Sequence, residues 1–396
     1  MADNNENKVL NVPHLRFPEF TDEWGKYKLS DVCSFFSGGT PSSSKKEYYD
    51  GSIPFIRSGE LHMNKTELFI TEEGLNNSAA KMVEIGDLLL ALYGATSGDI
   101  AIGQIKGAIN QAILCIRTTQ NKKFIESVWK KHVEKLLQTY LQGGQGNLSA
   151  DIVKNISFYF ANSSEQMKLA KFISLLDERI ATQNKIIKDL KKLKSAIVEM
   201  LLCNRNSELL KLGDIGYFVR GLTYANEDVT ENKAATAVIR ANNLNYGNHV
   251  DKGEVVYVSR TPATSQILRK GDIVICMANG SSALVGKNSY YPFNDGQSTV
   301  GAFCGIYRTS HPLAKWLMQS RRYKRLVYQS LQGGNGAIAN LNGDDILNMS
   351  FPVMEKEKSK SIIFILETIE KTLAVNKCLQ MSCSTQKSHL LKQMFI

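Results

Sequence analysis

Several groups of residues have the types that enzymes use, but none has the required spacing. The stretch 280–288 resembles a phosphate-binding loop, yet five residues instead of four separate Gly280 from Gly286-Lys287, and Asn288 replaces the magnesium-binding Ser or Thr. The six histidines are dispersed and the seven cysteines contain no C-x-x-C, so neither a zinc site nor a disulfide framework is indicated. The Asn-Pro-Pro-Tyr type of tetrapeptide that amino-methyltransferases use is also missing. We therefore expect no catalytic residues and no metal site in this chain.

Two glycine-rich turns leave an alternative open. Gly143-Gly144-Gln145-Gly146 and its later counterpart at 333–336 resemble nucleotide-binding glycine clusters. The predicted order is helix, turn and strand, however, whereas a dinucleotide site requires strand, turn and helix. The favoured interpretation is a helix C-terminal turn that needs positive φ angles, and direct phosphate contact is the alternative.

Length and composition predict a globular protein of two or three domains, because domains average roughly 100 to 200 residues and this chain has 396. No apolar run approaches the ~20 residues of a membrane span, and the N-terminus lacks an apolar signal core, so we expect a cytoplasmic protein. The net charge of +10 is compatible with a polyanionic partner but does not prove one.

The chain contains an internal repeat. Lys28-Leu29-Ser30-Asp31-Val32 returns as Lys211-Leu212-Gly213-Asp214-Ile215, and Leu141-Gln142-Gly143-Gly144 returns as Leu331-Gln332-Gly333-Gly334. The offset rises slowly along the chain, as loop insertions would produce. The ordered matches indicate a tandem duplication of about 190 residues, the sequence mark of repeated structural units.

Each copy first mixes short strand-like runs with Gly-, Asn- and Ser-rich turns, which predicts a compact α/β (α+β) domain. Predicted strands include 53–56, 88–92 and 113–116 in the first copy, and 237–239 and 273–275 in the second. A helix at about 122–141 precedes the first glycine turn, and 311–331 is its expected counterpart.

The second part of each copy, about 165–203 and 356–396, contains no Pro or Gly and predicts one long helix. Apolar residues at every third and fourth position form a coiled-coil seam. If equivalent domains make equivalent helix contacts, a two-fold axis relates the helices and their pairing is antiparallel. We also expect Gln183 to face Asn376 and Lys194 to face Lys387. Ordinary core helices of a bundle are the alternative. The seam consists of Ile173, Leu176, Ile180, Ile187, Leu190, Ile197, Leu366, Ile369, Leu373, Leu390 and Met394.

These features together resemble the specificity subunit of type I restriction-modification systems, and the likeness spans nearly the whole chain. Its marks are the entry 15–20 with Trp24, Ser37-Gly38-Gly39-Thr40-Pro41, Ile109-Asn110-Gln111-Ala112, the paired glycine turns and the ending 390–395. The second copy departs from the pattern, because Gln297-Ser298 stands where we expect Asn-Gln. A different target for the second copy is therefore expected.

The resemblance implies two target recognition domains, 1–163 and 205–354, and two conserved helical spacers, 164–204 and 355–396. It implies that each domain reads one half of a bipartite double-stranded DNA target, and that the helices recruit two adenine-specific methyltransferase subunits and, in larger complexes, two restriction or translocase subunits. S-adenosylmethionine, ATP and Mg are expected on those partners and no cofactor on this chain.

Polar loops at strand ends are the expected DNA contacts, because Arg, Asn, Gln, Ser and Thr read base edges while Lys and Arg hold phosphates. Ordinary solvated turn chemistry is the alternative for each residue. The expected contacts are Thr40, Lys45, Lys46, Arg57, Ser58, Thr96 and Ser97 in the first copy, and Arg220, Thr223, Arg240, Asn242, Asn243, Asn279, Ser281 and Ser282 in the second.

Charge is concentrated in the predicted helices. Residues 165–203 contain eight basic and five acidic residues, and 356–396 contain seven and three, so the two recognition domains together carry only about +3. This predicts modest DNA affinity for the isolated chain, since phosphate contacts dominate affinity. Two rival functions remain: a duplicated scaffold that binds protein or glycan, and an enzyme with a cryptic site, which would require turnover by the isolated chain.

Overall fold

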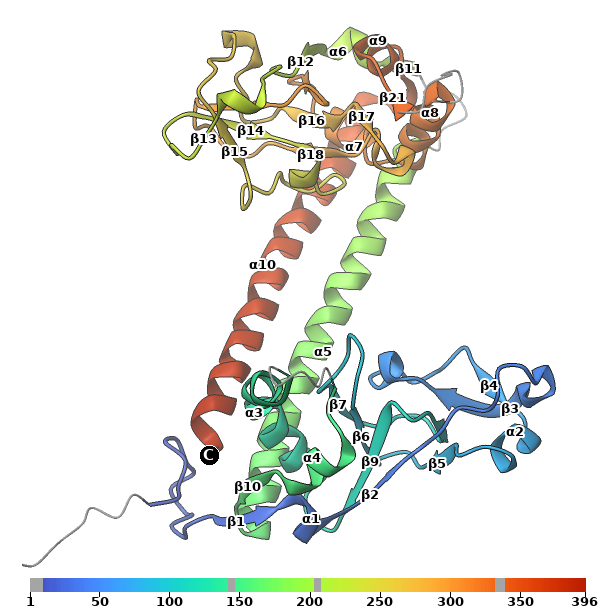
Figure 1. Cartoon of the computed structure of the whole chain (residues 1–396). Helices are drawn as coiled ribbons and strands as arrows, with labels where there is room; N and C mark the ends of the chain where they lie inside the picture. The colour runs from blue at the N-terminus through green and yellow to red at the C-terminus, as the bar shows by residue number, and fades with distance from the viewer. Residues whose placement is uncertain (1–9, 142–146, 203–207, 332–338) are drawn as a thin grey trace, which may run out of the picture. The chain divides into compact units, whose positions relative to one another are not determined.

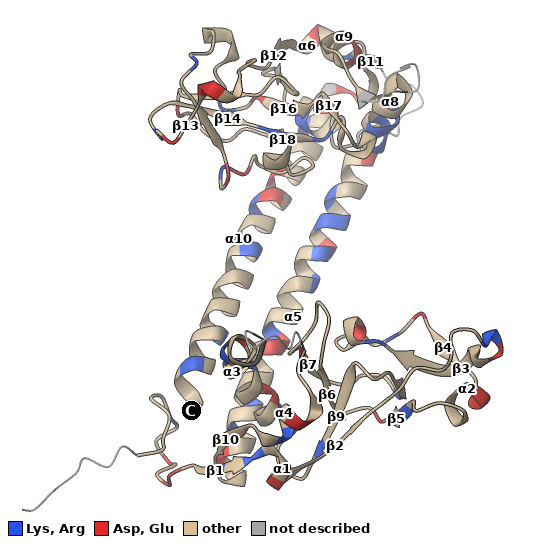
Figure 2. Ribbon diagram, viewed as in Figure 1, with Lys and Arg blue, Asp and Glu red and all other residues tan. Residues whose placement is uncertain are grey.

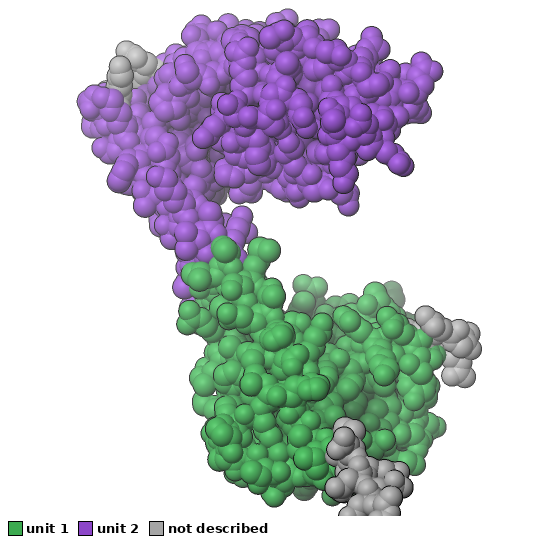
Figure 3. All heavy atoms as spheres, turned by 90° about the vertical axis from the view of Figure 1, so that its left-hand side faces the viewer, with its two compact units in different colours: residues 1–184, 378–396 green, residues 185–377 purple. Residues whose placement is uncertain are grey.

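The computed structural model describes residues 10–141, 147–202, 208–331 and 339–396 (Figure 1). The chain forms two compact units: unit 1 contains residues 1–184 and 378–396, and unit 2 contains 185–377 (Figure 3). Unit 1 is therefore built from both ends of the chain. The glycine turns at 143–146 and 333–336 lie outside the residues that the structure fully describes.

Unit 1 contains two four-stranded sheets and a two-stranded ribbon. The first sheet has the order β2-β9-β6-β7 and is antiparallel, and the second has the order β4-β3-β8-β5 with one parallel pair, β3 and β8. The predicted strands at 53–56, 88–92 and 113–116 are confirmed. The strands are β1 (Gly25–Lys28), β2 (Cys33–Ser37), β3 (Tyr49–Ile56), β4 (Phe69–Ile70), β5 (Lys81–Val83), β6 (Leu88–Ala91), β7 (Ile100–Ile102), β8 (Gly107–Ile109), β9 (Ile113–Thr118) and β10 (Ser157–Phe160).

Unit 2 repeats this plan with a different second sheet and an additional two-stranded pair, β17-β21. Its first sheet, β12-β20-β16-β18, corresponds strand by strand to that of unit 1, while its second sheet has the order β13-β15-β14-β19 with β14 and β19 parallel. The strands are β11 (Glu208–Lys211), β12 (Tyr217–Arg220), β13 (Val229–Thr230), β14 (Thr236–Ile239), β15 (Val256–Val258), β16 (Ile273–Cys276), β17 (Ala278–Asn279), β18 (Asn288–Tyr290), β19 (Ser298–Val300), β20 (Cys304–Arg308), β21 (Ala339–Asn340) and β22 (Ser350–Val353).

Short helices connect these strands. Several begin at a side chain that caps the first turn: Thr71 accepts from Gly74 N, and Ser149 accepts from Ile152 N. They are α1 (Leu29–Val32), α2 (Glu72–Asn76), α4 (Ala150–Asn155), α6 (Leu212–Ile215) and α9 (Gly343–Leu347), with 3-10 turns η1 (Lys46–Tyr48), η2 (Ser58–Glu60), η3 (Asn226–Asp228), η4 (Ala241–Asn243), η5 (Thr264–Gln266) and η6 (Ser282–Leu284).

The helix that precedes each glycine turn differs between the units. α3 (Lys122–Leu141) matches the prediction, but the expected counterpart at 311–331 is two helices, α7 (Ala314–Leu317) and α8 (Arg321–Leu331). Ser320 explains the break, because its hydroxyl donates to Leu317 O and accepts from Tyr323 N, ending one helix and capping the next. The prediction of one continuous helix in the second copy was therefore wrong.

The two long helices are α5 (Ser163–Met200) and α10 (Lys356–Met394). In unit 1, Ile173 and Leu176 of α5 pack in one core with Leu390 and Met394 of α10. In unit 2, Ile187, Leu190 and Ile197 pack against Ile369 and Leu373, while Leu366 lies in the main core. Positions rise along one helix as they fall along the other, so within each unit the pairing is antiparallel, as predicted. Ile180 is half-buried.

One expectation about this pairing was wrong. Lys194 binds Glu370 in unit 2, and Lys387 binds Asp177 in unit 1, so the two lysines do not face each other. The reason is geometric: in an antiparallel pair, repeat-related residues meet only at the two-fold axis. Each unit instead contains the same lysine–carboxylate pair 193 positions apart in sequence.

The C-terminus completes the core of unit 1. The ring of Phe395 lies 5.5 Å from that of Phe124 and 6.3 Å from that of Trp24. Glu165, at the start of α5, is 1% exposed and accepts hydrogen bonds from Arg16 Nε (2.7 Å) and Trp24 Nε1 (3.1 Å). The entry segment, the start of α5 and the end of α10 are thus held together around one buried carboxylate and one aromatic cluster.

Candidate nucleic-acid interface

In unit 1 the expected DNA contacts divide between the two ends of β3. Because β3 and β8 are parallel, Arg57 and Asn110, which follow them, lie at the same edge of the second sheet. Lys45 and Lys46 precede β3 and lie at its other end, about 23 Å away at ~3.3 Å per residue. A hydrogen bond to the hydroxyl of Tyr48 (2.8 Å) orients Lys45 and raises its pKa.

A close backbone approach brings Thr40 to the edge that holds Arg57 and Asn110. A Cβ atom on Gly38 would lie 1.8 Å from the carbonyl oxygen of Ile109, so only glycine fits where the chain crosses the end of β8. Two residues later, the hydroxyl of Thr40 donates to Oε1 of Gln111 (2.6 Å). Both side chains are exposed, which leaves the Gln111 amide group oriented and accessible for base-edge hydrogen bonds.

Arg57 is exposed but already has an anionic partner. Its guanidinium binds the carboxylate of Glu60 (2.7 Å), which is 7% exposed, and Glu60 also accepts from the Arg57 backbone amide (3.0 Å). Burial favours the neutral acid, but these bonds outweigh it and hold the pKa of Glu60 below its usual value. The ion pair orients Arg57 and cancels its charge. Ser58, the next residue, is half-buried in η2.

The loop between β6 and β7 holds Thr96 and Ser97, and both are half-buried. The hydroxyl of Ser97 donates to Leu92 O (3.0 Å), so this side chain stabilises the loop. Tyr93 belongs to the same loop. Burial raises its pKa, and a hydrogen bond with Gln111 opposes that shift, which joins this loop to the Thr40–Gln111 pair.

Unit 2 has the same edge with different side chains. A Cβ on Gly221 would lie 2.1 Å from Gly301 O, which repeats the close approach of Gly38, and exposed Thr223 follows as Thr40 does. The segment between β19 and β20 is 301–303, so Gly301-Ala302 corresponds to Asn110-Gln111. The alignment of Gln297-Ser298 with Asn-Gln was wrong, since Ser298 begins β19. Phe303, 67% exposed, lies at this edge.

Arg240 occupies the position of Arg57, and Asn243 occupies that of Glu60. Asn243 accepts from the Arg240 backbone amide (2.9 Å) as Glu60 does from Arg57, but it carries no charge. Its amide also donates to Glu254 O (3.1 Å), and the residue is 3% exposed, so the expected DNA contact of Asn243 is replaced by a structural role. No ion pair of Arg240 is found among the described residues. Asn242 is exposed beside it.

The remaining expected contacts of unit 2 lie on other loops. Arg220 ends β12 and is exposed, and its backbone carbonyl accepts from Gln266. Asn279 is half-buried and accepts from the backbone amide of Ser281, which is exposed together with Ser282. Sequence reasoning did not select Gln111, Tyr93 or Phe303 as site residues. Gln111 and Phe303 follow a strand of a parallel pair, which was the available signal, but parallel pairing was not predicted.

The described residues contain no group of three or more His, Cys, Asp or Glu that could hold a metal ion. Among the helices in the described ranges, none is long and apolar enough to cross a membrane. What both edges offer is oriented amide, hydroxyl and guanidinium groups, which suit hydrogen bonding to a polar ligand better than bond-making chemistry.

Comparisons with known proteins agree with this chemistry. A family model described as the type I restriction modification DNA specificity domain matches residues 21–192. The specificity subunit of the type I restriction enzyme MjaVIII from Methanocaldococcus jannaschii is 22% identical over 407 aligned positions, which cover 94% of this chain and 91% of that protein. The chain belongs to the type I restriction-modification specificity subunits. Its role is to determine the DNA target, without catalysis of its own.

Further relatives of this specificity subunit support the family and the fold. The EcoKI specificity subunit of Escherichia coli K12 is 28% identical over 168 positions, 39% of this chain and 35% of that one. The crystal structure of the S subunit from M. genitalium covers 97% of this chain and 99% of its own, with a TM-score of 0.61 and 15% identity. A chain from a structural study of the assembly of the type I R-M system has a TM-score of 0.55 at 14% identity, covering 94% and 97%. These structures show the same fold.

Proposed function

We propose that this specificity subunit reads a bipartite DNA sequence, one half with each unit. The observation that carries the proposal is the repeated strand-end edge: a close backbone approach recurs at Gly38 and Gly221, whereas the exposed side chains differ. Equal geometry with unlike polar groups predicts two recognition surfaces of the same kind that prefer different bases. The Thr40–Gln111 pair suits an adenine edge, and exposed Phe303 suits an apolar contact such as a thymine methyl group.

A domain exchange tests this assignment. Replacing residues 15–163 with the corresponding segment of another specificity subunit should change one half of the methylated sequence and leave the other half and the gap unchanged. The measurement is the map of methylated adenines in a genome that carries the hybrid gene with its methyltransferase partner. A change in both halves would contradict the assignment of one half to each unit. If DNA binding in the presence of the methyltransferase is absent or insensitive to salt, the rival scaffold function is favoured.

We further propose that the long helices dock two methyltransferase subunits, and that restriction or translocase subunits join the full complex in the cytoplasm. S-adenosylmethionine, ATP and Mg would then be bound by those partners, one of which must flip the target adenine out of the duplex to reach it. Two features support docking on the helices: Lys and Arg follow both helices (Figure 2), and Phe364 and Ile365 of α10 are 71% and 45% exposed. Adjacent exposed apolar residues typically mark a protein interface.

The docking proposal is tested by charge substitution on this patch. Phe364→Asp together with Ile365→Asp should abolish co-purification with the methyltransferase subunit, because a buried carboxylate in an apolar interface is costly. Thr385→Asp, at an exposed uncharged residue of the same helix, is the matched control and should co-purify normally. Normal co-purification of the double variant would place the interface elsewhere.

A further inference from the structure

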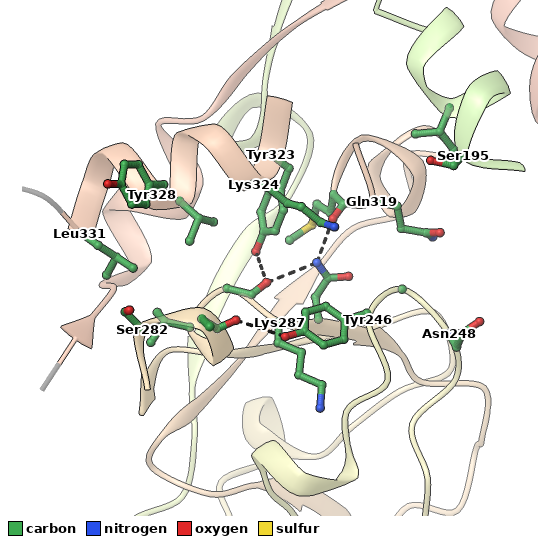
Figure 4. A pocket seen from close by; sticks show the side chains of 18 of the residues that line it. Ser195, Tyr246, Asn248, Ser282, Lys287, Gln319, Tyr323, Lys324, Tyr328 and Leu331 are labelled. Atoms are coloured by element: carbon green, nitrogen blue, oxygen red, sulfur yellow. Dashed lines mark hydrogen bonds between the residues drawn. The ribbon is translucent and has the colours of Figure 1, made fainter. Parts of the chain in front are cut away.

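A cavity of about 1380 Å³ opens in unit 2 between the loop 280–288, helix α8 and the last turns of α5 (Figure 4). The buried part of its lining includes the apolar residues Val198, Val285 and Val327. Two hydrogen bonds keep this part rigid: Tyr323 donates to Gly286 O (2.9 Å), and Asn288 Nδ2 donates to Met318 O (2.9 Å). The cavity is therefore a formed site and large enough for a ligand of several tens of atoms.

The charge of this cavity is of one sign. Four lysines line it, whereas its lining contains no Asp or Glu. Lys194 is neutralised, because it binds Glu370 at 2.8 Å. Lys191, Lys287 and Lys324 have no ion pair with any described residue. Three uncompensated ammonium groups around one cavity predict an anionic ligand, since phosphate groups are held by such side chains.

Unit 1 has opposite charge at the corresponding place, which shows that the cationic lining is not required by the fold. Asp99 corresponds to Lys287: the Asp99 carbonyl accepts from Ala91 N, and the Lys287 carbonyl accepts from Cys276 N, both at 2.8 Å. Asp99 binds His62 at 3.0 Å, whereas Lys287 lies 5.1 Å from the ring centre of Tyr246. A carboxylate–imidazole pair in one unit is thus replaced by a lysine and an aromatic ring in the other.

The uncharged groups of the cavity indicate which kind of anionic ligand it would bind. Tyr246 and Tyr328 line it with 55% and 64% of their surfaces exposed, and their rings offer flat faces. Asn248 and Gln319 add amide groups that can bind the edge of a base. Aromatic faces, amides and ammonium groups together are the usual means of holding unpaired nucleotides, by stacking, edge hydrogen bonds and phosphate contacts. An anion without a ring would use only the lysines.

We propose that this cavity binds a nucleoside phosphate, either as a free nucleotide or as an unpaired nucleotide of a DNA strand. The phosphate contacts Lys287 and its neighbouring lysines, and the base stacks on a tyrosine ring. Among the described residues of unit 1, Asp99 stands at the position of Lys287, so the proposed site belongs to unit 2. It is separate from the strand-end edge of unit 2, because none of Thr223, Arg240 or Phe303 lines it.

Calorimetric titration of the full chain tests the proposal with four probes: AMP, ATP, a single-stranded hexamer of deoxyadenosine and inorganic phosphate. We expect binding of at least one nucleotide probe below 1 mM. Lys287→Asp, which introduces the residue of unit 1, should weaken it at least tenfold, and Lys287→Gln should weaken it less. Tyr328→Ala should weaken nucleotide binding about tenfold, the usual effect of a lost stacking partner, and leave phosphate binding unchanged.

The nucleotide probes distinguish the two possible sources of the ligand. Binding of AMP and ATP indicates a free nucleotide, and binding of the hexamer alone indicates a DNA strand. The matched control is Asp99→Asn in unit 1, which should change none of these affinities. The proposal is overturned if no nucleotide probe binds, if Lys287→Gln and Lys287→Asp both bind like the wild type, or if a glutamate peptide displaces the nucleotide with equal affinity.

This inference does not depend on the reading of two half-sites. The same variants can be assayed for the methylated sequence in the complex with the methyltransferase. A cavity variant that loses nucleotide binding but keeps the methylated sequence supports a separate site. A domain exchange that changes both halves of the methylated sequence, with nucleotide binding intact, would count against the proposed function alone.

Discussion

Units 1 and 2 contain the same arginine–aspartate ion pair with different exposure to solvent. In unit 1, Arg117 binds Asp87 (2.7 Å), and the arginine side chain is 45% exposed. In unit 2, Arg308 binds Asp272 (2.7 Å), and its side chain is only 9% exposed, with further bonds to Ser265 O and Ile267 O. Both units thus keep the arginine–aspartate pair that links the first sheet to the Gly-Asp turn, but the arginine is buried only in unit 2.

The strand-end edges proposed to contact DNA differ in the charge of the group beside their arginine. In unit 1 the arginine after the parallel strand is neutralised by Glu60, and in unit 2 Asn243 leaves Arg240 charged. Both partners accept from the arginine backbone amide, so the turn is conserved while its charge is not. The comparison teaches that the bond to the arginine backbone amide can be made by either a carboxylate or an amide, so the buried partner sets the charge around an exposed arginine that both units keep.

The largest expected effect concerns the enclosed arginine. Arg308→Ala should lower the free energy of unfolding of unit 2 by about 3 to 5 kcal/mol, because it leaves the Asp272 carboxylate buried without its partner. Arg117→Ala should cost less, because water reaches the arginine and Lys122 remains 3.8 Å from the Asp87 carboxylate. Urea denaturation of the two variants measures both values. Equal losses would show that burial does not distinguish the two connections.

The lysine–carboxylate pairs of the long helices should behave alike in both units. Burial favours the neutral acid, but Lys194 and Lys315 outweigh it and hold the pKa of Glu370 below its usual value. For Asp177, burial is likewise outweighed, here by Lys123 and Lys387. A carboxyl group whose pKa is lower in the folded than in the unfolded state stabilises the folded protein at pH values above its unfolded-state pKa. This stability is therefore lost as the pH falls below about 4.

We therefore expect Glu370→Gln and Asp177→Asn each to lower the free energy of unfolding at pH 7 by about 2 kcal/mol. Each variant should also lose less stability than the wild type as the pH falls. Thermal unfolding between pH 3 and pH 7 gives the measurement. Lys360→Gln removes an exposed pair on α10 and serves as the control, with little change expected. If the stability of either carboxylate variant depends on acid pH as in the wild type, that lysine–carboxylate pair does not stabilise the helix pairing.

The smallest expected effect sharpens the contrast between the two edges proposed to contact DNA. Arg240→Ala should weaken binding of the assembled complex to its target about tenfold, within the range of a lost arginine contact to a base or phosphate. Arg57→Ala should weaken it less, because Glu60 already takes up its charge. Equilibrium binding at two salt concentrations distinguishes them, and the larger loss for Arg57 would reverse the comparison. Glu60→Gln is a useful companion, expected to raise affinity and salt dependence.

The sequence by itself determined the repeat, the two α/β domains and the antiparallel pairing of the long helices, because these follow from local pattern: matching motifs, apolar periodicity and the absence of Pro and Gly in 165–203 and 356–396. It also placed exposed Thr40, Thr223 and Arg240 at strand ends. Their contact with DNA stays a prediction.

Only the tertiary structure decided which side chains face one another. Asn243 became a buried structural residue, Ser320 divided the expected helix, and Lys194 found Glu370 instead of Lys387, each through a contact that sequence spacing does not encode. Gln111 joined Thr40 because the chain at Gly38 crosses the end of β8, although the two residues are far apart in sequence. Hydrophobic periodicity specifies which face is buried, but partners across a sheet or a helix pair depend on register and topology, which one chain's pattern does not reveal.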